Sequence, residues 1–152
     1  MEKIKAAQIG CGGRNGAHFQ KLSSFADVDI VGFCDIIPER AEARRNAYGS
    51  GKAYTDYVQM LDETNPDVVF IAVPPHVHGE IEPELIKRKI HFLVEKPMAL
   101  DYSVAEHICD EAEKAGILTA VGFQDRYQSL TDIMKDYIKD KQIGLVSGGW
   151  LG

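Results

Sequence analysis

A glycine-rich segment near the start of the chain has residue types suited to holding a phosphate. It reads Gly10-Cys11-Gly12-Gly13-Arg14-Asn15-Gly16 and follows an apolar run. Glycines between a strand and a helix make a tight turn and let backbone N–H groups approach a pyrophosphate, which then rests on the helix N-terminus. Gly10 and Gly12 keep the dinucleotide spacing, whereas Asn15 stands at its last glycine position. The segment therefore indicates a dinucleotide site; a mononucleotide pocket, an S-adenosylmethionine pocket and an ordinary turn are the alternatives.

An acidic residue stands where a ribose-binding carboxylate is expected. Asp35 ends the second apolar run, near the offset of about 20 residues from the glycines that dinucleotide-binding units show. A carboxylate there accepts hydrogen bonds from ribose hydroxyls and repels a 2′-phosphate, which favours NAD over NADP. The alternative is that Asp35 only caps the next helix. Arg40, Arg44 and Arg45 follow, and we expect them on a solvated helix face rather than at a phosphate.

A lysine follows the fifth apolar run, within the sequence Val94-Glu95-Lys96-Pro97. Open α/β sheets bind their ligands at the carboxyl ends of the strands. A lysine at that place can hydrogen-bond a substrate hydroxyl and stabilise the negative charge that develops as hydride leaves the carbon. Glu95 would position this lysine, and Pro97 would restrict the backbone, with a cis bond as one option. A surface turn is the alternative interpretation.

Histidine and cysteine spacing does not favour a metal centre. His76 and His78 lack further suitable ligands nearby, so a zinc site is not expected. The three cysteines, Cys11, Cys34 and Cys109, are an odd number without paired spacing. That usage fits a reducing compartment, and we expect a cytoplasmic protein.

Short apolar runs alternate with helical patterns along the chain. The expected strands are 4–9, 28–34, 53–55, 68–73, 90–94 and 118–122. The expected helices are 17–25, 38–48, a short one over 58–61 capped by Asp56, 80–87, one capped by Asp101 or Ser103 and ended by Gly116, and a last one over 130–138. Alternation of this kind predicts an α/β fold, a Rossmann-type doubly wound parallel sheet with helices on both faces.

Length and composition exclude several classes of protein. The chain has 152 residues, 45% of them hydrophobic and 26% charged, and a net charge of −6. An acidic chain without a basic run is a poor partner for nucleic acid. No apolar run approaches the roughly 20 residues that a membrane span needs. Residues 1–8 lead directly into the glycine segment, so no signal peptide is expected.

The end of the sequence has an unusual pattern. Residues 144–152 read Gly-Leu-Val-Ser-Gly-Gly-Trp-Leu-Gly, which is typical of a strand just beginning, and no partner strand follows. We therefore expect three parts: a dinucleotide-binding Rossmann domain over 1–122, a connecting helical segment over 123–143, and over 144–152 the truncated first strand of a missing C-terminal domain.

In combination, these features resemble the N-terminal half of the Gfo/Idh/MocA oxidoreductases, the family of glucose–fructose oxidoreductase and inositol dehydrogenase. The motifs that carry the resemblance span essentially the whole chain. In order they are Gly10-Cys11-Gly12-Gly13 with His18, Cys34-Asp35, Tyr54-Thr55-Asp56-Tyr57, Val73-Pro74-Pro75-His76-Val77-His78, Glu95-Lys96-Pro97 and Val121-Gly122-Phe123-Gln124-Asp125-Arg126-Tyr127. Two departures are Asn15, where the family usually has glycine or alanine, and Pro75-His76, where it often has Pro-Asn.

The resemblance implies NAD(P)-dependent transfer of hydride from a secondary hydroxyl of a sugar, inositol or related polyol. Lys96 would be the catalytic residue that contacts this hydroxyl, and Arg126 would face the substrate. The implied cofactor-binding residues are Gly10, Cys11, Gly12, Gly13, Arg14, Asn15, Asp35, Pro74, His78, Glu95 and Gln124. Family members also carry a second domain that closes the substrate pocket and builds homo-oligomers. The 152-residue chain alone would then be inactive.

Two other functions remain open at this point. One is a non-catalytic nucleotide-binding module that acts as a sensor or scaffold. The other is an S-adenosylmethionine-binding domain, which shares the glycine segment and the ribose-binding acid but gives no reason for Lys96. Titration with NAD and with S-adenosylmethionine separates the second of these from a dinucleotide-binding domain.

Overall fold

The computed structural model describes residues 3–13 and 16–140, and for Gly16 and Ala17 only the backbone. The chain divides into two compact units, Met1–Gly122 and Phe123–Gly152. Each unit is described by itself below. The strand expected over 144–152 lies outside the described residues.

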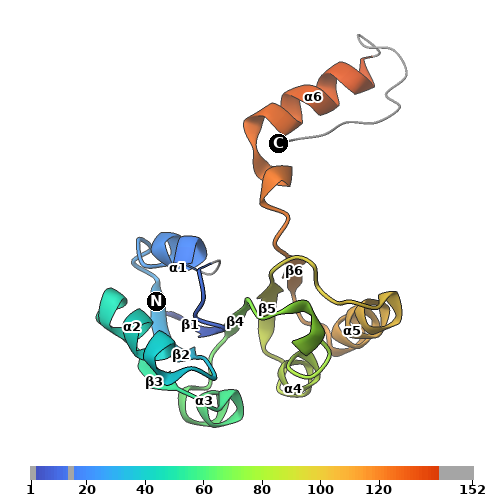
Figure 1. Ribbon diagram of the computed structural model, residues 1–152. Coiled ribbons are helices and arrows are strands. Elements are labelled where there is room, and N and C mark those ends of the chain that lie inside the picture. The colour runs from blue at the N-terminus through green and yellow to red at the C-terminus, as the bar shows by residue number, and fades with distance from the viewer. Residues whose placement is uncertain (1–2, 14–15, 141–152) are drawn as a thin grey trace. The chain divides into compact units, whose positions relative to one another are not determined.

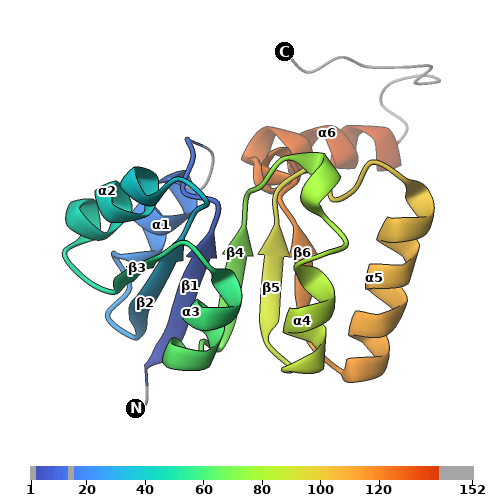
Figure 2. The same cartoon turned by 60° about the horizontal axis from the view of Figure 1, so that its bottom comes forward.

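The first unit is a single parallel sheet with helices on both faces (Figures 1 and 2). Its strands are β1 (Ile4–Ile9), β2 (Val28–Cys34), β3 (Lys52–Tyr54), β4 (Val68–Ile71), β5 (His91–Val94) and β6 (Thr119–Val121). Its helices are α1 (Gly16–Leu22), α2 (Pro38–Tyr48), α3 (Tyr57–Thr64), α4 (Glu82–Lys87) and α5 (Tyr102–Ala115), with the 3₁₀ turn η1 (Pro75–Val77). The strands lie in the order β3-β2-β1-β4-β5-β6, and each pairing is parallel. This confirms the Rossmann-type fold predicted from the sequence.

The order of the strands reverses between β1 and β4, which are hydrogen-bonded neighbours with Ile9 opposite Ile71. The chain leaves β1 toward one side of the sheet and leaves β4 toward the other. In open α/β sheets this topological switch point is where the loops diverge and a ligand can enter. The carboxyl ends of β1, β2 and β4 meet at the same edge of the sheet, and the site described below lies there.

Two apolar clusters hold the helices to the two faces of the sheet. The larger one joins β1, β4 and β5 to α3, α4 and α5, and includes the fully buried Met60 and Leu85. The smaller one joins β2, β3 and β4 to α1 and α2. In it, the Phe19 ring packs against Phe33 at a centroid distance of 5.6 Å and against Phe70 at 5.5 Å. Apolar burial on both faces anchors the loops that follow the strands.

Several helix ends follow the local sequence. The Asp56 side chain accepts hydrogen bonds from the N–H groups of Val58 and Gln59, which confirms the predicted cap of α3. Gly49 and Gly116 end α2 and α5 in the left-handed conformation. For α5, the predicted position of the cap is correct, since Asp101 is the N-cap residue. The predicted capping hydrogen bond is wrong, because the Asp101 side chain makes none.

The second unit contains the 3₁₀ turn η2 (Gln124–Tyr127) and the helix α6 (Ser129–Lys139). The predicted last helix is thus present and slightly longer than expected. No helix among residues 3–13 and 16–140 is long and apolar enough to cross a membrane.

Candidate functional site

The glycine segment begins at the end of β1, beside the end of β4. The Gly10 N–H donates to the Cys34 carbonyl at 2.8 Å, and the Ala72 N–H donates to the Ile9 carbonyl at 2.9 Å. Gly10 has φ +84°, and a Cβ built on it would stand 2.2 Å from the Ala72 oxygen. Only glycine adopts this backbone without strain and also leaves room for the neighbouring strand. Packing within the sheet therefore requires Gly10 before any ligand does.

Replacement of Gly10 by alanine is expected to destabilise the fold by roughly 3 kcal/mol. About 1–2 kcal/mol comes from the left-handed backbone, and about 1–3 kcal/mol from separating the two backbones. Gly49 provides a matched control, because it has φ +67° and a Cβ placed on it would meet nothing within 4 Å. Gly49→Ala should lose only the backbone part. Urea unfolding of both variants measures the difference, and equal losses would contradict the role of the Ala72 contact.

Asp35 connects the end of β2 to the glycine segment. Its Oδ2 accepts a hydrogen bond from the Cys11 N–H at 2.8 Å, and its Oδ1 accepts one from the Ile37 N–H at 2.9 Å. The side chain is buried with 8% of its surface exposed. Each carboxylate oxygen has a second lone pair, so ribose hydroxyls can still be accepted. Asp35 thus does more than cap a helix, since it fixes two loops and remains a hydrogen-bond acceptor.

A cavity of about 340 Å³ lies at this edge of the sheet. Its walls include Ile9, Gly10, Gly12, Cys34, Asp35, Ile36, Arg40, Thr55, Tyr57, Ala72, Val73, Pro74, Val77, Glu80 and Ile81. The lining is mostly apolar with a few charged groups, and the volume falls at the lower end of the range for ligand pockets. The structure therefore brings Gly10, Gly12, Asp35 and Pro74 of the predicted site residues together around one cavity.

Sequence reasoning missed several residues of this cavity, among them Ile36, Thr55, Tyr57 and Val77. Ile36 and Thr55 directly follow Asp35 and the end of β3, at the edge of the sheet that carries the site. In a parallel sheet the first residues after each strand gather at one edge. That rule, applied to every strand rather than to β2 alone, would have identified them.

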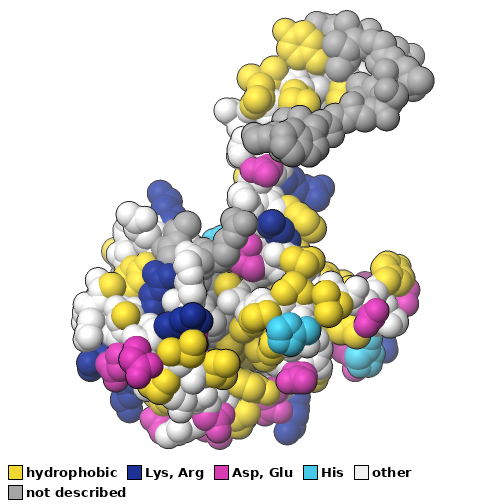
Figure 3. Space-filling view, in the orientation of Figure 1, with side chains coloured by type: hydrophobic (Ala, Val, Ile, Leu, Met, Phe, Trp, Pro, Cys, Tyr) yellow, Lys and Arg dark blue, Asp and Glu magenta, His cyan; other side chains and the backbone are white. Residues whose placement is uncertain are grey.

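A basic recess adjoins the glycine segment. It is lined by Cys11, Gly12, Gly13, Arg40, Ala43, Arg44 and Ala47. Arg40 lines both this recess and the larger cavity. Lys and Arg side chains gather on this part of the molecular face in Figure 3, although the chain as a whole is acidic. Local positive charge beside backbone N–H groups suits an anionic ligand.

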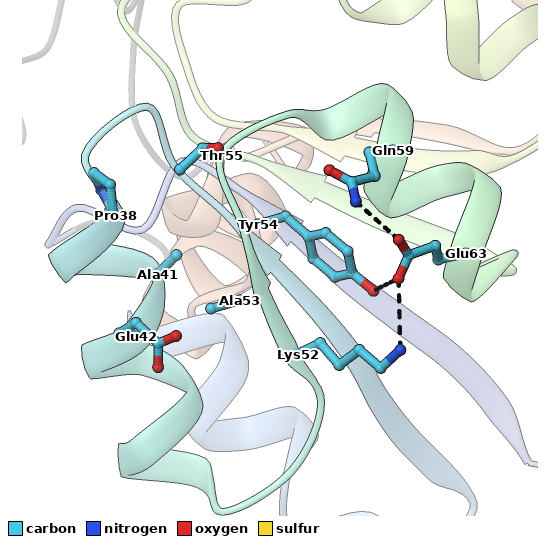
Figure 4. Close-up of a pocket in the computed structure, with 9 residues that line it drawn as sticks. All are labelled: Pro38, Ala41, Glu42, Lys52, Ala53, Tyr54, Thr55, Gln59 and Glu63. Atoms are coloured by element: carbon cyan, nitrogen blue, oxygen red, sulfur yellow. Dashed lines mark hydrogen bonds and ion pairs between the residues drawn. The ribbon is translucent and has the colours of Figure 1, made fainter.

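A second cavity, of about 400 Å³, lies between α2, β3 and α3 (Figure 4). Its polar side chains converge on Glu63, which accepts hydrogen bonds from the Tyr54 hydroxyl at 3.0 Å and the Gln59 amide at 2.9 Å. Lys52 pairs with the same carboxylate at 3.5 Å. Burial, and then the bond to Glu63, raise the pKa of Tyr54 to about 12. Because these groups satisfy one another, we assign this cavity to the packing of the β3 edge.

Glu95 and Lys96 have different environments at the end of β5. Glu95 is buried, and its Oε1 lies 2.7 Å from Nε2 of His18 on α1. A Cβ on Gly122 would stand 2.9 Å from the same oxygen, so the glycine at the end of β6 makes room for this carboxylate. Lys96 is exposed, and its bond to Pro97 is cis. The pair His18–Glu95 thus ties α1 to the strand end from which Lys96 projects.

His78 pairs with a buried glutamate. Its Nδ1 lies 2.6 Å from Glu82 Oε1, and the other oxygen of Glu82 accepts the Gly79 N–H at 2.7 Å. Both side chains are almost fully buried. His78 is not among the residues that line the cavity containing Asp35; it lines a separate recess with His76 and His107. Within residues 3–13 and 16–140, no group of three or more His, Cys, Asp or Glu side chains could hold a metal ion.

The other predicted site residues fall elsewhere. Cys11 and Gly13 line the basic recess. Arg14 and Asn15 lie outside the described residues. Gln124 and Arg126 belong to the second unit, in η2.

Two of the three thiols are expected to be inert. Burial, and then the nearby Asp35 carboxylate, raise the pKa of Cys11 to about 12, and burial followed by Asp56 does the same for Cys34. Their thiolate fractions are therefore very small at pH 8, whereas Cys109 is exposed. With a thiol-reactive dye and the folded chain we expect fast labelling of Cys109 alone, and of all three cysteines in denaturant. Fast labelling of Cys11 in the folded chain would contradict its burial.

Comparison with known proteins places this fold among NAD-binding oxidoreductases. The model of the GFO_IDH_MocA family, described as an oxidoreductase family with an NAD-binding Rossmann fold, matches residues 4–123. Glucose-6-phosphate 3-dehydrogenase of Bacillus subtilis is 31% identical over 144 residues, which are 95% of this chain and 40% of that protein.

Solved structures agree with this match. The myo-inositol 2-dehydrogenase of Lactobacillus plantarum superposes with a TM-score of 0.86 at 25% identity, over 95% of this chain and 43% of that one. The WlbA dehydrogenase of Bordetella pertussis, in complex with NADH and UDP-GlcNAcA, also has a TM-score of 0.86 at 25% identity, over 94% and 44%. The chain thus spans about 40% of the length of the relatives it matches.

Proposed function

The chain belongs to the Gfo/Idh/MocA oxidoreductase family and carries its NAD-binding Rossmann fold, and on this premise we propose that it serves hydride transfer between NAD and a secondary hydroxyl of a sugar, inositol or related polyol. The observation that carries the proposal is the cavity at the switch point, with Asp35 and the glycine segment on its walls. A nicotinamide cofactor supplies the hydride chemistry when it is bound. The protein supplies binding, orientation and charge.

The residues on the cavity wall fit a dinucleotide. Asp35 would accept hydrogen bonds from the hydroxyls of the adenosine ribose, and the apolar walls around Ile36, Val77 and Ile81 suit the adenine ring. The backbone N–H groups of the glycine segment would receive the pyrophosphate, and the positive charge of the adjoining recess would favour it. The cavity therefore offers an acceptor, an apolar surface and an anion site.

The charges around Asp35 favour NAD over NADP. Asp35 and Glu80 both line the cavity, against the single cation Arg40 among its described lining residues. A 2′-phosphate would bring about two further negative charges next to the buried Asp35 carboxylate. Like charges at that range disfavour binding. Arg44, which also lies on α2, is engaged with backbone carbonyls.

We extend the proposal to the substrate end of the site. Lys96, exposed after β5, would hydrogen-bond the reacting hydroxyl, and Glu95 with His18 would hold the strand end that carries it. Residues 1–122 would form the cofactor domain, 123–143 a connecting helical segment, and 144–152 the first strand of a substrate domain. The greater length of the relatives supports this division. A homo-oligomeric assembly is part of the same proposal.

Calorimetric titration of the 152-residue chain with NADH, NADPH and S-adenosylmethionine tests the cofactor assignment. We expect NADH to bind most tightly, because NADPH would place a phosphate beside Asp35 and S-adenosylmethionine lacks the pyrophosphate that the glycine segment would receive. Tighter binding of S-adenosylmethionine, or no binding of NADH at millimolar concentration, would refute the proposal. Tighter binding of NADPH would refute the preference for NAD alone.

A further inference from the structure

Arg44 lies on α2 and contacts the glycine segment. Among the described residues, it is the only arginine of α2 with hydrogen bonds to that segment. Its Nε donates a hydrogen bond to the Cys11 carbonyl at 3.2 Å, and its Nη2 donates one to the Gly12 carbonyl at 2.6 Å. The sequence predicted a solvated side chain, and this prediction is wrong, since Arg44 is half-buried. Its planar guanidinium donates to two successive carbonyls at once. A lysine ammonium is a compact point charge and does not reproduce this two-pronged geometry.

These two bonds orient two peptide planes. A trans peptide is planar, and its N–H points opposite to its C=O. With the Cys11 and Gly12 carbonyls bound to Arg44, the N–H groups of Gly12 and Gly13 point away from α2. Successive N–H groups that share a direction form an anion-binding concavity. The guanidinium also places a positive charge directly behind these donors.

The glycine segment needs such support. Glycine residues have the largest freedom to lose on ordering, and neither Gly12 nor Gly13 has an atom within 4 Å of a Cβ built on it. Side-chain packing therefore does not restrain these two residues. A loop that is already held in its binding conformation loses less entropy when a ligand arrives.

The neighbouring arginine on α2 has a different partner. Arg45 is exposed, and its Nη2 pairs with Glu42 at 2.8 Å, one turn earlier on the helix. Successive residues of a helix are about 100° apart around its axis, so Arg44 and Arg45 point to different sides. Helix α2 thus carries a matched pair of arginines: Arg44 contacts the glycine segment, and Arg45 pairs within its own helix at the surface.

We propose that Arg44 is a positioning residue for the dinucleotide pyrophosphate, which it serves by holding the peptide planes of Cys11–Gly12 and Gly12–Gly13. This inference rests on the proposed function, because it takes the pyrophosphate of NAD(H) as the ligand of the segment. It assigns to α2 a role in phosphate binding that is separate from the ribose contact of Asp35. Arg44 acts through the backbone and needs no direct contact with the cofactor.

Affinity measurements with three probes test the inference on the 152-residue chain. NADH and ADP-ribose contain the pyrophosphate, whereas adenosine does not. Arg44→Ala should weaken NADH and ADP-ribose about tenfold and leave adenosine within about twofold, by calorimetry or NMR titration. Arg44→Lys keeps the charge but not the fork, and should recover only part of the loss. Arg45→Ala should change none of the three.

Hydrogen exchange supplies a second readout. With saturating ADP-ribose, the Gly12 and Gly13 amides should be protected from exchange in the parent chain and in Arg45→Ala, and less protected in Arg44→Ala. If Arg44→Ala does not fold, the Lys variant is judged by the same comparisons. Unchanged affinity for ADP-ribose in the Arg44 variants would overturn the inference, as would an equal loss for adenosine, which indicates general damage.

The NADPH titration separates a third possibility. If Arg44→Ala weakens NADPH far more than NADH, Arg44 reads a 2′-phosphate directly, and the positioning role is wrong. Failure of the parent chain to bind NADH would refute the proposed function itself. Binding of NADH by the parent chain, with no loss in the variants, would refute only the role of Arg44.

Discussion

Asp35→Ala is expected to weaken NADH binding by at least about two orders of magnitude. The carboxylate would accept two hydrogen bonds from ribose hydroxyls, and bonds to a charged group contribute about 1.5–3 kcal/mol each. The sum, roughly 3–6 kcal/mol, corresponds to a factor of at least about 10² in the dissociation constant. The variant also loses the acceptor for the Cys11 and Ile37 N–H groups, so the loops around the cavity lose their common anchor.

Isothermal calorimetry on the 152-residue chain measures this effect. Asp35→Asn keeps the shape and one acceptor oxygen, and should fall between the parent and the alanine variant. Asp29→Ala removes an exposed carboxylate from the same strand and serves as the control. The preference for NADH over NADPH should shrink in Asp35→Ala, because the repelling charge is gone. A loss below about threefold would show that Asp35 only organises the loops.

Lys96→Ala is expected to lower kcat for polyol oxidation about 10²–10³-fold while NADH affinity changes little. An ammonium at the end of β5 acts on charge that develops on the substrate oxygen only as hydride departs. Interactions made in the transition state appear in kcat, whereas uniform binding appears in KM. Loss of one donor of this kind costs roughly 3–4 kcal/mol, by analogy with an oxyanion-hole donor.

This test needs two measurements. The NADH dissociation constant is measured on the 152-residue chain. The turnover number kcat is measured on a form of the protein that oxidises a polyol. Lys114→Ala, which removes an exposed lysine paired with Glu111 on α5, is the matched surface control. A fall in kcat below about threefold would leave Lys96 as a solvated turn residue. Absence of turnover in every longer form that binds NADH would favour a non-catalytic sensor or scaffold.

Much of the fold follows from local features of the sequence. The bounds of β1, β2 and α2 agree with the prediction, since apolar runs mark the two strands and Pro38 marks the start of the helix. Parallel pairing is predicted because strands that alternate regularly with helices usually form crossover units, in which the helix returns the chain to start the next strand in the same direction. Gly10 and Asp35 were identifiable because each stands at the end of such a strand.

Longer-range contacts required the tertiary structure. Gly10 is required by the Ala72 carbonyl, which lies 2.2 Å from where a Cβ would stand. His18 reaches Glu95 across 77 positions of the chain, and Arg44 reaches the glycine segment across about thirty.

The sequence by itself determined the parallel α/β architecture, the edge of the sheet that carries the site, and the residue types suited to a dinucleotide. Only the tertiary structure decided which side chains support that site: Arg44 beneath the glycine segment, and His18 beside Glu95. The physical reason is the range of the interactions. Secondary structure is governed by hydrogen bonds and apolar repeats within a few residues, whereas these contacts depend on which rotamers the packed helices bring to a shared edge.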